Sequence, residues 1–303
     1  MSLRHPPDGP GPRPVVPDPR LDGPGSRPVV PGPRPRTRRG VLRETGILLA
    51  AAAVLALAAF GAQRLLVPKA PASDLARRLD DGLGLLLREQ IRATSRVIDV
   101  PAAADDLALI VGRLREALPE PRPSFEVLVV QSPEINAFTL PGNTVCLDTG
   151  LLHALASADE LAGVLGHEMS HAVNRDPLTM LMRNLGVAAL LNVISGGQGG
   201  AVLANMAQTL VDVHYGREAE DRADDFSVRL LARAGIPPGA FADALARIKD
   251  SAPKEPGLLK YLDPHSPIDQ RIARARELAR KQAFSPRSLK VDWAALVKAL
   301  PGR

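Results

Sequence analysis

The string His167-Glu168-Met169-Ser170-His171 constrains this chain more than any other feature. Histidines four residues apart on a helix lie on one face, so both imidazoles can bind one metal ion, and the glutamate between them can hold a water molecule at that ion. Zinc hydrolases use this arrangement, in which two nitrogen ligands and a carboxylate base need a further protein ligand. The alternative is a surface helix with two unrelated histidines, because five residues also match by chance.

The surrounding residues predict a helix over about 158–173. Ser157 and Glu160 form the S-x-x-E pattern of a capping box. An apolar run with helical spacing follows, at Leu161, Val164, Leu165 and Met169. One side of this helix is therefore core, and both histidines lie at the edge of that side, where a buried metal ion can bind.

A third ligand is expected from the acidic run 217–225. This run opens a second helical pattern that ends at Gly235, a residue type common at helix C-termini. Glu220 and Asp224 are four residues apart and share a face. Glu220 can therefore bind zinc, while Asp224 accepts an N–H from a ligand histidine. The alternative is a solvated acidic helix face.

Four blocks, in order along the chain, carry a resemblance to a known family. They are residues 136–142 followed by Gly150-Leu151-Leu152, the H-E-x-x-H string with Arg175, residues 220–224 as E-x-x-A-D, and residues 265–272 as H-x-x-x-x-x-R-I. Over about residues 124–280 the chain resembles the HtpX/CAAX-prenyl-protease type of membrane-associated zinc metallopeptidases, in the gluzincin clan. Two residues depart from the family pattern, Asn143 and Ser266. Neither is a ligand position.

This resemblance implies one zinc ion per chain, bound by His167, His171 and Glu220. It makes Glu168 the general base and then the general acid of peptide hydrolysis. The chemistry agrees with this assignment, because zinc lowers the pKa of a bound water to about 7 and polarises the scissile carbonyl.

The resemblance also implies roles for three further residues. Asp224 supports a ligand, and Arg271 pairs with an acidic group near the site. His265 either donates to the oxyanion of the intermediate or occupies a fourth metal position. The sequence leaves both roles of His265 open.

Residues 124–147 predict a small sheet beside the zinc helix. Their β-branched content predicts strands over 124–130, 137–140 and 144–147. An edge strand beside a zinc site can bind an extended peptide through backbone hydrogen bonds, which accepts many sequences. The substrate edge is assigned to Asn136, Ala137, Phe138, Pro141 and Gly142. A purely structural sheet is the alternative.

Residues 1–44 predict a disordered tail. They hold 12 of the 29 prolines, and nine arginines against three aspartates and one glutamate. Such a composition cannot bury a core. The tail accounts for the whole net charge of +5, so the remainder is neutral and predicts no nucleic-acid surface. The tail can dock a proline-binding module, with a solvated tail as the alternative.

Residues 45–67 predict one transmembrane helix. Residues 47–62 are apolar, and with the extension to Val67 about twenty residues can span a bilayer. Arginines at 36, 38, 39 and 43 favour a cytoplasmic N-terminus at the cell (inner) membrane, which places the catalytic domain in the periplasm or outside the cell. A cleaved signal peptide is the alternative, and the forty-residue tail argues against it.

Residues 184–211 carry no charged residue but do not predict a second span. His171 and Glu220 must bind one ion, so the chain would have to cross twice, and two crossings need about forty residues. We expect two short helical arms around a Gly-rich bend, which cover the cleft or dip into the membrane surface. Two further helices are expected at about 73–98 and 104–118.

Together these patterns predict an α+β, mainly helical, gluzincin-type zinc peptidase with a small edge-strand sheet and one N-terminal transmembrane helix. The predicted parts are the tail 1–44, the span 45–67, a helical segment 68–122 that packs on the protease, the metallopeptidase domain 123–280 and a helical extension 281–303. The sole cysteine, Cys146, excludes an intrachain disulfide.

By resemblance, the function is zinc-dependent endopeptidase activity in envelope protein quality control. The expected partners are unfolded or damaged polypeptides and membrane lipid. The alternative is a non-enzymatic membrane-bound scaffold or chaperone with a structural zinc site. The intact Glu168 argues against a scaffold, because a structural site needs no base.

Overall fold

The computed structural model describes residues 74–98, 101–197, 200–212, 215–251 and 267–301. The predicted tail 1–44 and transmembrane helix 45–67 lie outside these residues, as does His265. All described residues belong to one of the chain's two compact units, Ala58–Arg303.

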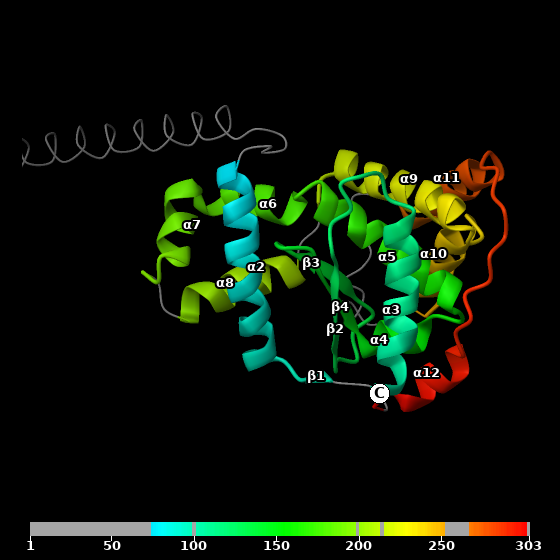
Figure 1. Cartoon of the computed structure of the whole chain (residues 1–303), viewed down its shortest axis with the longest axis horizontal. Helices are drawn as coiled ribbons and strands as arrows, with labels where there is room; N and C mark the ends of the chain where they lie inside the picture. Colours follow the sequence, from blue (N-terminus) through cyan, green and yellow to red (C-terminus); the bar gives the residue numbers. More distant parts are fainter. Residues whose placement is uncertain (1–73, 99–100, 198–199, 213–214, 252–266, 302–303) are drawn as a thin grey trace, which may run out of the picture. The chain divides into compact units, whose positions relative to one another are not determined.

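A four-stranded mixed sheet stands between two layers of helices (Figure 1). Its strands are β1 (Val97–Ile98), β2 (Glu126–Val130), β3 (Ala137–Leu140) and β4 (Thr144–Asp148), in the order β1-β2-β4-β3. β2 and β4 run parallel, and β3 pairs antiparallel with β4, with Phe138 opposite Cys146. The prediction of a mainly helical fold with a small sheet is therefore confirmed, and β3 is an edge strand of the described sheet.

The two faces of the sheet belong to two different hydrophobic cores. Successive residues of a strand point to opposite faces. Val129, Ala137, Val145 and Leu147 join one core. The alternate residues join the other: Leu128, Val130, Phe138, Leu140 and Cys146. Burial on both faces explains why these strands read as nearly continuous apolar runs.

The first helical layer is centred on α5 (Ala158–Val173). This helix packs against the sheet through β3 and against α9 and α10. The layer also contains α3 (Pro101–Glu116), α4 (Thr149–Ala154), α9 (Arg217–Ala234), α10 (Ala240–Asp250), α11 (Ile268–Arg280) and α12 (Trp293–Ala299). α9 ends as predicted, with Gly235 in the left-handed conformation at φ 74°.

Of the two hydrogen bonds that a capping box predicts at the start of α5, only one forms. The Ser157 hydroxyl accepts a hydrogen bond from the Glu160 N–H at 3.1 Å. The Glu160 carboxylate accepts instead from the Ala156 N–H, at 2.7 Å, and pairs with Arg247 of α10. Glu160 therefore ties the start of α5 to α10 as well as capping it.

The second layer contains α2 (Asp74–Thr94), α6 (Asp176–Leu185), α7 (Val187–Ile194) and α8 (Gly200–Val211). α2 buries a stripe at helical spacing, Leu79, Leu83, Leu87 and Ile91. The two short arms expected within 184–211 are α7 and α8. In the part of the chain that the structure describes, no single helix has the length and apolarity of a membrane span. α6 and α7 reach both only as a pair, bent by 106°.

The first predicted helix ends earlier than expected. It was expected to reach residue 98, but α2 stops at Thr94 and the next residues form β1. Val97 and Ile98 pair with Val130 and Val129 of β2. β-branched residues favour a strand when a partner is available, so sheet pairing overrides the helical pattern here.

A close backbone contact joins α2 to the turn between β3 and β4. A Cβ added to Gly84 would lie 2.5 Å from the carbonyl oxygen of Pro141 and 2.8 Å from the Cα of Gly142. Gly142 itself has φ 74°, a conformation that favours glycine. The turn that follows the edge strand therefore rests directly on the α2 backbone.

We expect Gly84→Ala to destabilise the fold. Alanine favours a helix over glycine by about 1 kcal/mol, but the new methyl group meets backbone that must shift, and such overpacking typically costs about 1–3 kcal/mol. Gly112→Ala in α3 is the matched control, because nothing lies within 4 Å of a Cβ there. Thermal unfolding should show a lower midpoint for Gly84→Ala and an unchanged or higher one for Gly112→Ala. Equal shifts would contradict the contact.

Candidate functional site

Three buried side chains, His167, His171 and Glu220, meet between α5 and α9, and each offers one ligand atom within 4.8 Å of the others. The two Nε2 atoms of the histidines are 3.2 Å apart. Oε2 of Glu220 lies 3.5 Å from Nε2 of His167, and Oε1 lies 3.7 Å from Nε2 of His171. The structure thus brings together the three residues predicted as ligands.

Asp224 and Arg271 support His167 on the Nδ1 side of its ring, away from the cluster. Nδ1 of His167 lies 3.0 Å from Oδ1 of Asp224. Arg271 of α11 donates to both carboxylate oxygens of Asp224, at 2.7 and 2.9 Å, and its Nη2 lies 3.5 Å from Glu220. Burial alone would raise the pKa of Asp224, but the hydrogen bonds from His167 and Arg271 lower it to about 2. Asp224 therefore stays ionised, and its stabilising contribution is lost only as the pH falls towards 2.

Asp176 and Arg222 hold His171 in the same manner. Nδ1 of His171 lies 2.9 Å from Oδ2 of Asp176, the first residue of α6. Arg222 of α9 donates to both oxygens of Asp176, at 2.7 and 2.8 Å. This second pair is not among the site residues predicted from the sequence. The Asp-Pro step just after α5, which is typical of a new helix start, is the signal that the sequence offers for it.

The geometry of this cluster fits a zinc ion. Ligand atoms about 2.0–2.1 Å from zinc at tetrahedral angles lie about 3.3 Å from one another, close to the separations of 3.2 to 3.7 Å found here. Both Nδ1 atoms face aspartates, so both Nε2 atoms carry lone pairs and point at each other and at Glu220. A buried convergence of two lone pairs and a carboxylate suits a cation.

We expect Asp176→Asn to weaken metal binding at this cluster by about 10- to 100-fold, the usual effect of removing a partner that orients a metal-binding histidine. The neutral amide accepts a weaker hydrogen bond from His171 and loses the ion pair with Arg222. Competition with a chromophoric zinc chelator measures the affinity. Asp243→Asn makes the same chemical change at an exposed position of α10 and should leave it unchanged. If both variants bound zinc with the same affinity, Asp176 would have no role in metal binding.

Glu168 points from α5 towards the edge strand. Its Oε2 accepts a hydrogen bond from the Thr139 hydroxyl of β3, at 2.8 Å, and the side chain is buried. The strand predicted to bind substrate therefore also holds the predicted base. Thr139 was not singled out from the sequence. It shares a face of β3 with Ala137, which packs on the side of α5.

The other residues assigned to the substrate edge lie along β3 and its ends. Asn136 donates from its side-chain amide to the carbonyl oxygen of Val211 at the end of α8, at 3.3 Å. Ala137 and Phe138 are buried on opposite faces of the strand. Pro141 and Gly142 form the turn that rests on α2. Their contact with a substrate stays a prediction.

Two aromatic rings cover the ligand histidines. Phe241 of α10 stacks on His167, with ring centroids 5.6 Å apart, and Tyr215 stacks on His171 at 4.2 Å. Burial raises the pKa of Tyr215 well above its ordinary value. Neither residue carries a recognisable motif, so only the folded structure reveals them. Because His265 lies outside the described residues, its predicted role stays a prediction.

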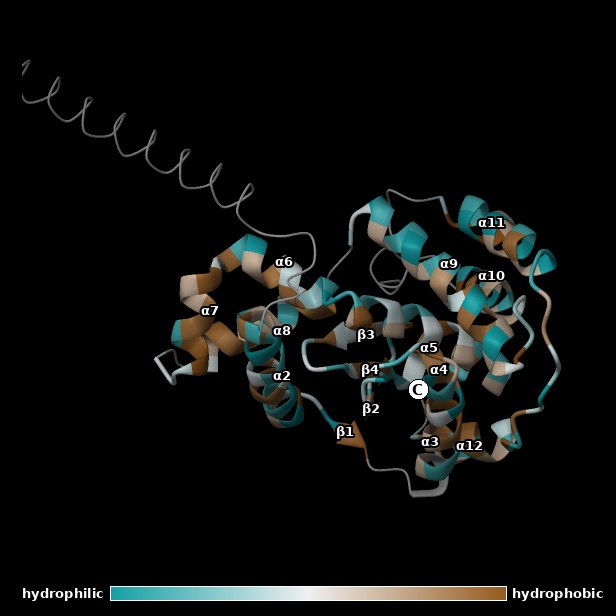
Figure 2. Ribbon diagram, turned by 45° about the horizontal axis from the view of Figure 1, so that its top comes forward, coloured by the Kyte–Doolittle hydropathy of each residue, from teal (hydrophilic) through white to brown (hydrophobic). Residues whose placement is uncertain are grey.

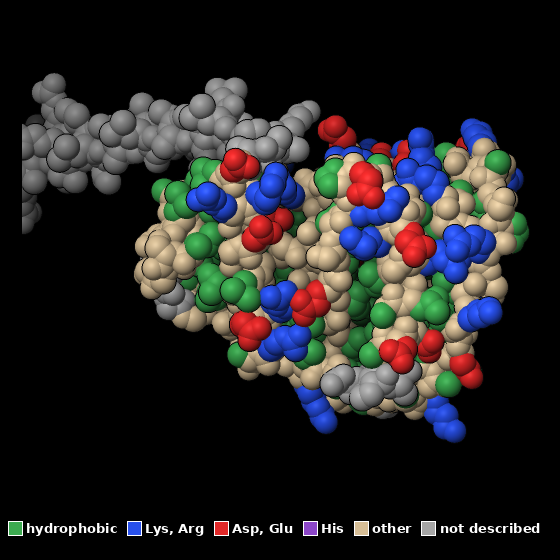
Figure 3. Space-filling model, viewed as in Figure 1, with side chains coloured by type: hydrophobic (Ala, Val, Ile, Leu, Met, Phe, Trp, Pro, Cys, Tyr) green, Lys and Arg blue, Asp and Glu red, His purple; other side chains and the backbone are tan. Residues whose placement is uncertain are grey.

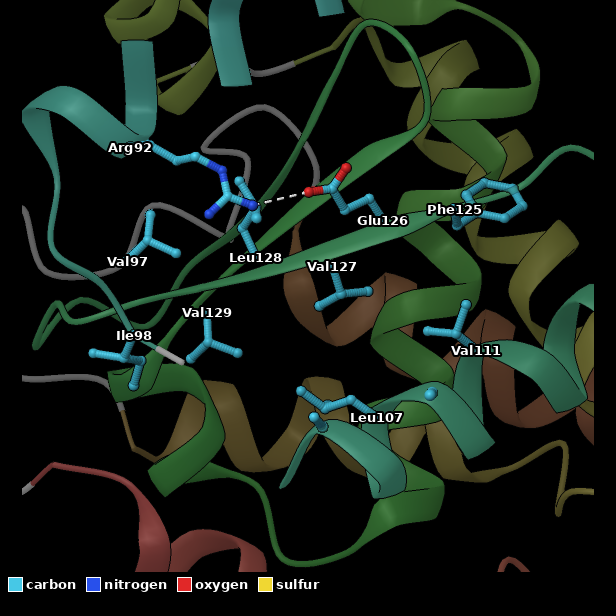
Figure 4. Close-up of a pocket in the computed structure, with 12 residues that line it drawn as sticks. Arg92, Val97, Ile98, Leu107, Val111, Phe125, Glu126, Val127, Leu128 and Val129 are labelled. Atoms are coloured by element: carbon cyan, nitrogen blue, oxygen red, sulfur yellow. Dashed lines mark hydrogen bonds and ion pairs between the residues drawn. The ribbon is translucent and has the colours of Figure 1, made fainter. Parts of the chain in front are cut away.

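Several cavities lie on the surface of the part of this unit that the structure describes. One, of about 510 Å³, borders Asp176, Tyr215 and Arg222 beside the cluster. Another, of about 550 Å³, lies between α3 and β2 and is lined by apolar residues together with the ion pair between Arg92 and Glu126 (Figure 4). The first of these cavities borders the two residues that support His171.

Comparison with known proteins gives a family match over most of the described fold. Residues 101–279 match the family model described as Peptidase family M48. The match begins before residue 124, where the resemblance seen in the sequence starts, and so includes α3. This extent has a physical reason, because α3 packs against α5 in the same core.

Three relatives show how far this likeness reaches. A protease HtpX homolog of Acidiphilium cryptum is 32% identical over 225 residues, which are 59% of this chain and 75% of that protein. The mitochondrial metalloendopeptidase OMA1 of Arabidopsis thaliana is 37% identical over 115 residues, 38% of this chain and 24% of its own length. The beta-barrel assembly-enhancing protease of Yersinia pestis is 27% identical over 222 residues, with coverages of 67% and 44%. The chain thus spans less than half the length of the last two.

Proposed function

The chain belongs to peptidase family M48, a metalloprotease family, and we propose that it is a membrane-anchored zinc endopeptidase that hydrolyses unfolded or damaged polypeptides. One observation carries the proposal. The predicted ligands His167, His171 and Glu220 converge within 4.8 Å, and the buried carboxyl group of Glu168 follows the first of them. A structural zinc site needs no adjacent base, so this arrangement favours an enzyme over a scaffold.

Zinc, when bound, supplies the activation of a water molecule and the polarisation of the substrate carbonyl. Glu168 takes the proton from the attacking water and then gives it to the leaving amine. The Thr139 hydroxyl, 2.8 Å away, holds the Glu168 carboxylate in place. Asp224 and Asp176 keep a proton on Nδ1 of the two histidines, so that both Nε2 atoms face the metal position.

His265 is proposed to complete the site as a donor to the oxyanion of the tetrahedral intermediate. Its other proposed role is a fourth metal ligand that closes the site at rest. Turnover of His265→Ala on an unstructured substrate separates the two roles. A fall supports the donor, a rise supports the closing ligand, and no change excludes both.

The proposed substrate class follows from the edge strand. A strand such as β3 binds a peptide through backbone hydrogen bonds, which requires the peptide to be extended but hardly restricts its sequence. Unfolded or damaged chains offer such segments and folded proteins do not. A role in envelope protein quality control is supported by the relative named for enhancing β-barrel assembly.

The proposed topology is a single span over 45–67, with a cytoplasmic N-terminus and the catalytic domain in the periplasm or outside the cell. The support comes from the apolar sequence and the four arginines before it. The likeness to protease HtpX homologs also supports an association with membranes.

Metal content and casein cleavage of the purified full-length chain test the proposal together. We expect about one zinc ion per chain, cleavage that a zinc chelator abolishes, and recovery of cleavage when zinc is returned. A protein that holds zinc firmly but leaves casein intact would support the scaffold instead. A protein that cleaves equally well without metal would contradict the zinc mechanism.

A further inference from the structure

Tyr215 lies against the ligand His171 but has no part in the mechanism proposed above. It comes just before α9, and its ring stacks on the imidazole of His171, with centroids 4.2 Å and planes 28° apart. Its hydroxyl group is buried and has no hydrogen-bond partner among the residues that the structure describes. Buried tyrosine hydroxyl groups usually have a partner, because an unpartnered one costs free energy of folding. The hydroxyl group of Tyr215 is therefore available to a molecule that binds at the cluster.

Solvent is close to Tyr215, yet its hydroxyl group does not reach it. The residue borders the surface cavity of about 510 Å³, and α9, which follows it, has a hydrophilic outer face (Figure 2). Tyrosine side chains usually bury the ring and keep the polar end in water, but here the hydroxyl group is buried. In the view of Figure 3 the described surface shows no histidine side chain, which agrees with the burial of His167 and His171. The hydroxyl group thus belongs to the same buried region as the cluster.

Packing alone does not explain a tyrosine at this position. Phe241 stacks on the other ligand histidine, His167, with ring planes 17° apart. A phenyl ring without a polar atom therefore suffices to cover a ligand histidine at this site. A phenylalanine at position 215 would stack on His171 in the same way and would bury no unpartnered hydroxyl group. The hydroxyl group of Tyr215 is therefore expected to have a role that the ring does not have.

The hydroxyl group lies near the carboxylates of the candidate site. Burial raises the pKa of Tyr215, and the charges of three carboxylates raise this pKa further. The charge of Glu168 has the largest of these three effects, followed by those of Asp176 and Glu220. Glu168 is the proposed base, and its carboxylate accepts a hydrogen bond from Thr139 but none from Tyr215. The hydroxyl group is therefore close to the base without being bound to it.

The carbonyl oxygen of a substrate is the acceptor that suits this donor. The proposed reaction adds a water molecule, deprotonated by Glu168, to the scissile carbonyl, whose oxygen becomes an oxyanion. A fixed donor at that oxygen accelerates the reaction, because its hydrogen bond strengthens as the negative charge develops. A phenol suits this task, since it stays protonated at neutral pH and carries no positive charge that a metal ion would repel. The stack on His171 fixes the ring that carries it.

We propose that Tyr215 is a catalytic residue whose hydroxyl group donates a hydrogen bond to the oxygen of the scissile carbonyl and to the oxyanion formed from it. This inference rests on the proposed peptidase function and adds to it a donor from the described part of the chain. The O–H bond of Tyr215 stays intact, while the proton of the attacking water passes to Glu168 and then to the leaving amine. A second donor, such as the one proposed at His265, can share the same oxyanion.

Tyr215→Phe in the zinc-loaded full-length chain tests this role, because it removes the hydroxyl group and keeps the stacked ring. We expect kcat on an unstructured peptide to fall by about 10²- to 10³-fold, the usual effect of removing one oxyanion donor, with KM nearly unchanged. The zinc content should stay the same. The midpoint of thermal unfolding should be equal or higher, because the folded protein loses no hydrogen bond.

Thr144→Val is the matched control for this variant. It also removes a buried hydroxyl group that has no partner among the described residues. Thr144 lies on the same face of β4 as Cys146, whereas α5 packs on the other face with Val145. Thr144→Val should therefore leave kcat and zinc content unchanged.

The affinity for a mimic of the transition state gives a second readout, which does not depend on turnover. A phosphinic peptide presents a tetrahedral, negatively charged centre in place of the scissile bond. Calorimetry on the zinc-loaded chain should show that Tyr215→Phe binds this peptide about 10²- to 10³-fold more weakly than the unaltered chain does. The amine product of the cleavage has no oxygen at this place and should bind both forms alike.

The outcomes separate this inference from the proposed function. If Tyr215→Phe cleaves the substrate and binds the phosphinic peptide as the unaltered chain does, the peptidase stands and the role of Tyr215 is overturned. If the variant loses zinc or stability, the hydroxyl group supports His171 and not the substrate, which also overturns the inference. If the unaltered chain neither cleaves the peptide nor binds its phosphinic mimic, the proposed function fails, and the inference fails with it.

Discussion

Glu168→Gln is expected to keep its zinc while cleavage falls by about 10³- to 10⁴-fold, the upper part of the range for removal of a general base. Glu168 is not one of the three clustered ligand atoms, so the metal position stays intact. The amide has nearly the shape of the carboxylate, and its oxygen can still accept from the Thr139 hydroxyl. The change therefore removes the basic group and little else.

The measurements are zinc content, thermal stability and the rate of casein cleavage. Glu116→Gln is the control, because it makes the same chemical change at an exposed position of α3. It should match the unaltered chain in all three. A Glu168→Gln variant that cleaves at the normal rate would exclude Glu168 as the base, and one that loses its zinc would make it a ligand instead.

Glu220→Ala is expected to lose both zinc and activity. It removes one of three protein ligands, so the fall in affinity should exceed the roughly 10- to 100-fold effect of removing a group that only orients a ligand. Asp224 keeps its two hydrogen bonds to Arg271 in this variant, so the neighbouring network should survive. The loss should therefore be one of metal and not of the fold.

Glu218→Ala is the control for this experiment. Glu218 lies two residues earlier on α9 and is exposed, whereas Glu220 is buried beside both histidines. Elemental analysis after dialysis should find zinc in Glu218→Ala and little in Glu220→Ala. The reverse result would transfer the third ligand to Glu218.

The helices around the site could be predicted from local sequence patterns, because neighbouring residues determine where they begin and end. Ser157 caps α5 through its own hydroxyl group, and Gly235 ends α9 in the left-handed conformation that glycine adopts most easily. The spacing of His167 and His171 needs only a helix to bring the two rings together. Glu220 and Asp224 are also four residues apart, so the helical spacing of α9 predicts that they share a face. They become candidates because the two histidines need a third ligand.

Contacts that depend on the tertiary fold were missed. Asp176 reaches His171 only because the chain turns at Arg175, in the left-handed conformation, and starts α6 at once. Phe241 reaches His167 because α10 packs on α5. β1 forms because β2 offers it a partner, while the sequence around Val97 continues a helical pattern. These long-range contacts cannot be predicted from the periodicity of the sequence.

Three residues of the site lie on one helix, α9, so the position of this helix affects all of them together. Within five positions it supplies the ligand Glu220, the residue Arg222 that holds Asp176, and Asp224 that holds His167. A slip of α9 by one residue turns these side chains by about 100° and removes all of them from the histidines together. The docking of α9 on α5 therefore sets the positions of all three side chains at once.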